Sequence, residues 1–147
     1  MAVTADRTRP RADPGASHPF HAFALSGAFV LFLGALLADY AYWSSHQIQW
    51  SNFASWLLVG GMVLASIAVL CEVFALFVGG RSWFRVLVVA ATWVVGFFDA
   101  LHHGRDAWAI MPAALWMSLL VTVLALVATW LAFASLPQAY ARAGGVR

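Results

Sequence analysis

The chain has 147 residues, of which 63% are hydrophobic and only 10% are charged. Ordinary globular proteins contain roughly 45–50% apolar and about 25% charged residues. This composition excludes a soluble monomer, a nucleic-acid-binding domain and a disordered protein, and it predicts an integral membrane protein. A single cysteine, Cys71, leaves no intrachain disulfide and no Cys-x-x-Cys-His site for covalent haem attachment.

Four apolar stretches follow a polar N-terminal segment. Residues 1–17 contain arginine, aspartate and proline but no apolar core, so we expect a disordered cytoplasmic tail there. A helix needs about 20 residues to cross a hydrocarbon core of about 30 Å. Within a membrane domain at 18–137, and before a second cytoplasmic tail at 138–147, the sequence predicts an all-α four-helix transmembrane bundle with helices at about 20–42, 52–78, 83–101 and 109–136.

The arginines predict the orientation of this bundle. Positively charged residues are enriched in cytoplasmic loops. Arg105 alone falls on one side, and the other seven arginines fall on the opposite side: Arg7, Arg9, Arg11, Arg81, Arg85, Arg142 and Arg147. We therefore expect a multi-pass protein of a bacterial inner membrane, with both termini in the cytoplasm and the connections at 43–51 and 99–108 in the periplasm.

Most ionisable side chains of the membrane domain gather at the predicted periplasmic level: Asp39, His46, Asp99, His102, His103, Arg105 and Asp106. Histidines and carboxylates together could bind a metal ion. If the third helix continues as far as His103, that residue shares a helix face with Asp99, and Asp39 could orient an imidazole. A b-type haem needs two histidines on opposite sides of its iron, and His103 with His46 is the candidate pair. Alternatively, these groups lie at headgroup level, cap helix ends or pair with Arg105.

Three more ionisable residues lie at the predicted cytoplasmic level: His18, His21 and Glu72. The two histidines are one turn apart, so they could bind a metal ion together. Glu72 is inside the second helix, where a carboxylate is costly without a partner. It could be a proton or metal ligand, or it could accept a hydrogen bond from His21 or pair with Arg81 or Arg85 and so fix helix packing.

Several uncharged residues complete the pattern. Ser118 and Thr122 share one face of the fourth helix and are expected to bond to backbone carbonyls or to a neighbouring helix. Trp93 and Trp116 are expected to pack between helices. Pro112 is predicted in the first turn of the fourth helix, where its missing N–H is tolerated.

The chain resembles a family of small bacterial membrane proteins catalogued as domain of unknown function 2231, over roughly residues 18–136. The resemblance is carried by three segments: His18-Pro19 before a helix ending in Asp39; Trp56 with Gly60 or Gly61; and Asp99-Ala-Leu-His-His103-Gly-Arg105-Asp106-Ala-Trp108 followed by Pro112 and Ser118. Asp99 stands where the family pattern has asparagine. The family has no established activity. The resemblance implies four transmembrane helices and a link to redox proteins.

These patterns favour an accessory or anchor subunit of a redox or respiratory membrane complex, with lipid, other membrane subunits or further copies of the chain as partners. One alternative is an electron carrier with a single haem b on His103 and His46. Another is a metal or proton transport component, although no ionisable residue falls near the predicted membrane midplane. The sequence contains no Gly-x-Ser-x-Gly or His-Glu-x-x-His motif, so an enzyme acting on its own is not expected.

Overall fold

The chain is helical throughout the part that the structure describes, which comprises residues 19–78, 82–105 and 107–144 of a computed structural model. Its elements are α1 (Pro19–Ser45), α2 (Ile48–Val78), α3 (Trp83–His103), the single turn α4 (Ala107–Ile110) and α5 (Ala113–Gly144). Four of them, α1, α2, α3 and α5, are long and apolar enough to cross a membrane. The prediction of an all-α four-helix transmembrane bundle is confirmed for these residues.

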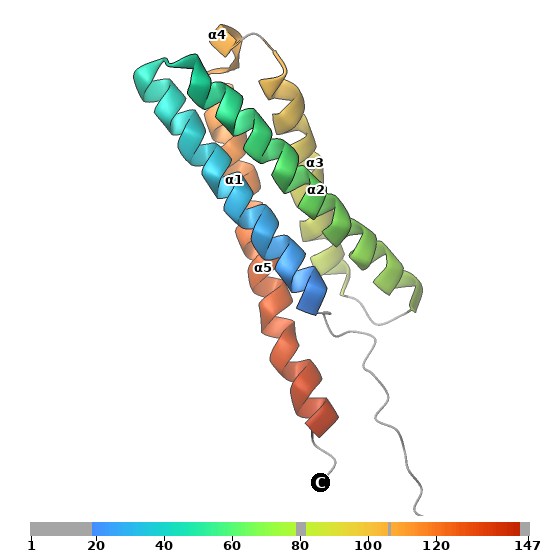
Figure 1. Cartoon of the computed structure of the whole chain (residues 1–147). Coiled ribbons are helices and arrows are strands. Elements are labelled where there is room, and N and C mark those ends of the chain that lie inside the picture. The colour runs from blue at the N-terminus through green and yellow to red at the C-terminus, as the bar shows by residue number, and fades with distance from the viewer. Residues whose placement is uncertain (1–18, 79–81, 106, 145–147) are drawn as a thin grey trace, which may run out of the picture.

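The four long helices run up and down, and each packs against two neighbours (Figure 1). α1 contacts α2 and α5, and α3 contacts the same two helices from the other side. α1 begins and α5 ends at one end of the bundle, here called the terminal end. The opposite end carries α4 and the connection between α1 and α2, and is called the α4 end.

The helix boundaries differ from the apolar stretches, mostly by extension. α1 continues to Ser45, α2 begins at Ile48 and α3 continues to His103. Polar residues at the end of a helix do not break its backbone hydrogen bonds, so the helix can extend beyond its apolar stretch. The predicted fourth helix at 109–136 was wrong at its start. α5 begins at Ala113, so Pro112 lies in the connection after α4, where its peptide bond to Met111 is cis.

Small residues let the helices approach closely at the centre of the bundle. The ring of Phe32 on α1 is fully buried and lies against glycines of two other helices. A Cβ atom built on Gly61 of α2 would come within 2.6 Å of this ring, and one built on Gly96 of α3 would lie 3.3 Å from it. Buried alanines surround this layer, as expected where membrane helices associate through van der Waals packing.

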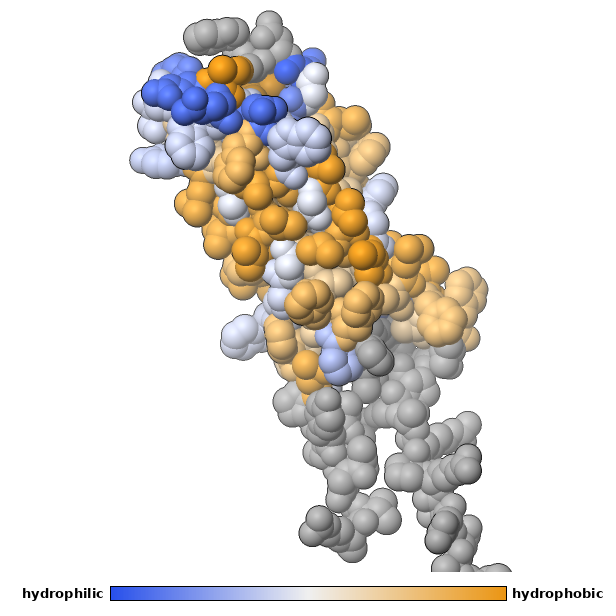
Figure 2. All heavy atoms as spheres, in the orientation of Figure 1, coloured by the Kyte–Doolittle hydropathy of each residue, from blue (hydrophilic) through white to orange (hydrophobic). Residues whose placement is uncertain are grey.

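Large apolar side chains cover the outside of the bundle. Figure 2 shows a broad hydrophobic band along the helices, with hydrophilic residues gathered at the α4 end. Exposed side chains on the four long helices include Val30, Phe74, Leu87 and Trp130. This surface matches the hydrocarbon interior of a bilayer, and with the four candidate spans it makes the chain a multi-pass membrane protein in contact with lipid.

Candidate functional site

A buried polar cluster joins three helices near the α4 end. It consists of Asp39 from α1, Asp99 and His103 from α3, and Ser118 from α5, and is called the Asp–His–Ser cluster below. The side chains of the two aspartates are fully buried, and that of His103 is 1% exposed. Buried ionisable groups in a membrane protein are costly and mark functional or packing sites.

His103 lies between the two carboxylates. Its Nε2 is 2.9 Å from Oδ1 of Asp39. Its Nδ1 is 2.9 Å from the backbone carbonyl oxygen of Asp99 and 3.2 Å from Oδ1 of the same residue. A carbonyl oxygen only accepts hydrogen bonds, so Nδ1 carries a proton and donates it to Asp99. The last turn of α3 sets this geometry, because residues four apart stack on one helix face.

Ser118 bridges the two carboxylates from the opposite side. Its Oγ lies 2.5 Å from Oδ2 of Asp39 and 2.9 Å from Oδ2 of Asp99. One turn later, Thr122 donates its hydroxyl proton to the backbone carbonyl of Ser118. Thr122 therefore bonds to a backbone carbonyl and Ser118 bonds to neighbouring helices, which are the two kinds of bond expected for these residues. The sequence did not indicate that Ser118 meets two aspartates, because the rotation of α5 about its axis decides this contact.

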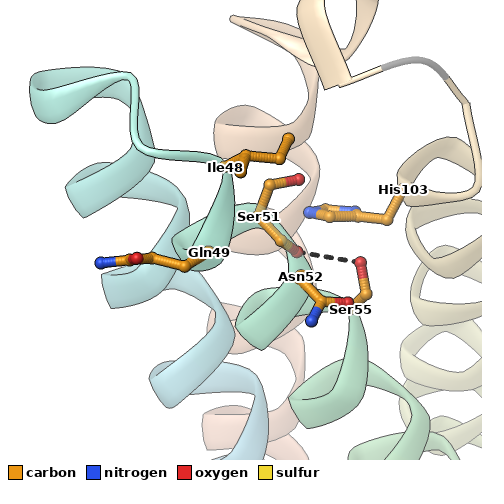
Figure 3. Close-up of a pocket in the computed structure, with 6 residues that line it drawn as sticks. All are labelled: Ile48, Gln49, Ser51, Asn52, Ser55 and His103. Atoms are coloured by element: carbon orange, nitrogen blue, oxygen red, sulfur yellow. Dashed lines mark hydrogen bonds between the residues drawn. The ribbon is translucent and has the colours of Figure 1, made fainter.

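A polar pocket of about 430 Å³ lies beside the cluster. Figure 3 shows the His103 ring pointing from α3 towards the first turns of α2. The pocket is open on one side, and its lining residues are Ile48, Gln49, Ser51, Asn52, Ser55 and His103. The hydroxyl of Ser55 is already bonded to the carbonyl of Ser51 at 2.9 Å. His103 is thus the one ionisable side chain that connects the pocket to the cluster.

The other candidate residues near this end do not join the cluster. Nε2 of His102 lies 3.1 Å from the backbone carbonyl of Ile110, so this ring ties α3 to α4. His46 is exposed in the connection between α1 and α2, with a φ of 56°. Arg105 is exposed. Asp106 and the side chain of Trp108 fall outside the described part of the chain.

A second buried pair lies towards the terminal end. Nε2 of His21 on α1 is 3.0 Å from Oε1 of Glu72 on α2, and both side chains are 2% exposed. The expected contact between these two residues is therefore confirmed. Arg81 and His18, which were also considered at this level, fall outside the described residues.

The cluster does not fit a bis-histidine haem as it stands. Each axial ligand must offer one ring nitrogen to the iron. Both nitrogens of His103 face Asp39 or Asp99 within hydrogen-bond distance. Iron binding would require one of these bonds to break. Among the described residues, no three histidine, cysteine or acidic side chains are arranged to hold a metal ion.

Comparison with protein-family models, with curated proteins and with solved structures gives no match to this chain.

Proposed function

We propose that the chain is an accessory or anchor subunit of a redox or respiratory complex in a bacterial inner membrane. The observation that carries this proposal is that the buried polar side chains contact one another across the helices of the bundle. They bond from one helix of the bundle to another, at the Asp–His–Ser cluster, at His21 with Glu72, and at Trp93 with Ser66. These bonds fix the relative positions of the helices and leave apolar outer surfaces for lipid or other membrane helices.

The redox part of the proposal depends on the resemblance to domain of unknown function 2231. The geometry favours a supporting subunit over a haem carrier, because both ring nitrogens of His103 are engaged within the chain. It also favours a supporting subunit over a self-contained transporter. The ionisable groups at the two ends are separated by the apolar layer around Phe32.

Cross-linking in intact membranes tests the association. A photoreactive residue is placed at one outward position on each long helix, namely Val30, Phe74, Leu87 and Trp130. The matched control is Leu58, which is fully buried. Cross-links from one helix face to a redox complex, together with a fall in that complex when the gene is deleted, support the proposal. A chain that cross-links only to lipid, with respiratory complexes at normal levels after deletion, contradicts it.

We further propose that the α4 end faces the periplasm and the terminal end faces the cytoplasm, as the arginine distribution predicts. Two exposed serines provide a matched pair of probes, Ser44 at the α4 end and Ser82 in the connection before α3. In a Cys71→Ser background, a membrane-impermeant maleimide added to spheroplasts should label Ser44→Cys. Ser82→Cys should react only after permeabilisation. The reverse pattern would overturn this orientation.

A further inference from the structure

The hydrogen bonds of the Asp–His–Ser cluster require more protons than its side chains hold when both aspartates are ionised and the histidine is neutral. We propose that Asp39, Asp99, His103 and Ser118 form a proton-binding site that exchanges protons with water through the pocket at His103. This inference goes beyond the proposed role as an accessory subunit and does not depend on it.

Each ring nitrogen of His103 makes a contact that needs a proton. The proton on Nδ1 is directed to the carbonyl of Asp99, as described above. The contact of 2.9 Å between Nε2 and Oδ1 of Asp39 needs another proton between two atoms that otherwise only accept. This proton is carried either by the imidazole or by the carboxyl group. A neutral histidine beside an ionised Asp39 would leave two lone pairs facing each other.

Ser118 contacts two carboxyl groups with a single hydroxyl proton. A hydroxyl group has one proton to donate, yet Ser118 Oγ lies within hydrogen-bond distance of both Asp39 and Asp99. If Ser118 donates its proton to one carboxylate, a separate two-centre hydrogen bond to the other requires that carboxyl group to donate to Ser118. One of the two aspartates is therefore a carboxylic acid when both contacts are made.

These two extra protons make the cluster electrically neutral. Two ionised aspartates contribute two negative charges, and the two added protons balance them. Neutrality matters because burying an uncompensated charge in a membrane is expensive. No other charged side chain is described within the cluster: α2 contributes only neutral residues to the adjacent pocket, and α5 contributes Ser118. Tyr40 and Tyr42 are the further titratable residues that follow Asp39 on α1; Tyr42, one turn on, is buried and Tyr40 is exposed.

Two observations indicate that the protons can leave and return. The pocket brings polar side chains of α2 to His103, whose ring shares a proton with Asp39. Oδ1 of Asp99 is buried and accepts no well-aligned hydrogen bond, although Nδ1 of His103 is 3.2 Å away. This oxygen is a free acceptor for a proton. Loss of one proton to water leaves the cluster with one negative charge, and uptake restores neutrality.

Infrared spectroscopy of the full chain in lipid vesicles tests the proposal directly. A buried carboxylic acid has a C=O stretch that is separate from carboxylate bands and shifts when its proton is exchanged for deuterium. We expect this band at neutral pH and expect it to shift in D₂O. It should be weakened or lost in both Asp39→Asn and Asp99→Asn. It should persist in the matched control Glu72→Gln, which removes the buried carboxyl group of the other pair.

Asp99→Asn is the more informative variant because its amide can donate a hydrogen bond to Ser118 without an acid proton. We expect it to fold like the wild type while the band is weakened or lost. If neither aspartate variant folds, aspartate labelled with ¹³C at the carboxyl group in the wild-type chain provides the same information by NMR. One protonated aspartate signal that exchanges with solvent supports the proposal. Fully ionised aspartates, a band lost only in Glu72→Gln, or an acid that does not exchange would overturn it.

Discussion

His21 and Asp39 lie on the same face of α1, eighteen positions apart, and each is buried against an ionisable side chain of another helix. Eighteen residues make about five helical turns, or about 27 Å along the axis. This length is close to the thickness of a hydrocarbon core. The two polar contacts are therefore separated by about the thickness of a hydrocarbon core, with Phe32 between them on the same helix.

The contact between His21 and Glu72 should contribute strongly to stability. His21→Ala should lower the free energy of unfolding by about 3 kcal/mol, because it removes the close contact that the imidazole makes with the buried carboxyl group of Glu72. Unfolding in mixed micelles, followed by circular dichroism, measures this change. Glu72→Ala should cost a similar amount, and the double variant should cost clearly less than the sum. Additive effects would show that the two side chains do not stabilise each other.

The packing of Phe32 against Gly61 should be intolerant of a single methyl group. Gly61→Ala places its Cβ 2.6 Å from the Phe32 ring, so we expect a loss of about 1–3 kcal/mol in thermal or denaturant unfolding. Gly60→Ala is the matched control, because its Cβ meets only a side-chain methyl of Leu31 at 3.2 Å. Adding Phe32→Leu should restore part of the loss. Equal stability of the two alanine variants would contradict this account of the core.

The indole of Trp93 ties α3 to α2 by donating its Nε1 proton to Oγ of Ser66 at 2.9 Å. Trp93→Phe should reduce the free energy of unfolding by about 1 kcal/mol through this bond, apart from any change in packing. Ser66→Ala should have a comparable effect, and combining the two should add little. Trp116→Phe provides the comparison, since the Trp116 side chain is 65% exposed. The prediction that Trp116 packs between helices is therefore wrong, because it lies on the outer surface of α5. A loss as large in that variant would show that the measured effect is not due to the bond.

The purified chain should have no Soret band. Both ring nitrogens of His103 are held by Asp39 and Asp99, so the imidazole does not offer iron a free lone pair. Absorption spectra in mild detergent, before and after dithionite, check this expectation. A Soret band that disappears in His103→Ala would show that the cluster opens to accept haem, and it would favour the electron-carrier hypothesis.

Much of the fold could be predicted from apolar run lengths, because a membrane-spanning helix must satisfy its backbone within itself. The contact between His21 and Glu72 could be anticipated for a similar reason, since a carboxylate inside a membrane helix needs a partner. The contact between Asp99 and His103 follows from their four-residue spacing on α3. The sequence also suggested Asp39 as an orienting group for an imidazole.

Other features depend on relations that a single sequence does not contain. Whether His102 or His103 faces inwards is set by the rotation of α3, and the meeting of Ser118 with two aspartates is set by the rotation of α5. The break at Pro112 was missed because proline is compatible both with a first helical turn and with a connection before a helix. Helix rotation and packing therefore had to come from the structure.

The apolar layer around Phe32 has an electrical consequence. A transmembrane voltage falls mainly across the low-dielectric part of a membrane, and about 100 mV is worth about 2.3 kcal/mol for a unit charge that crosses it completely. The Asp–His–Ser cluster and the pair of His21 with Glu72 lie on opposite sides of this layer. Each would therefore follow the potential and acidity of its own compartment, and the bundle would insulate one from the other.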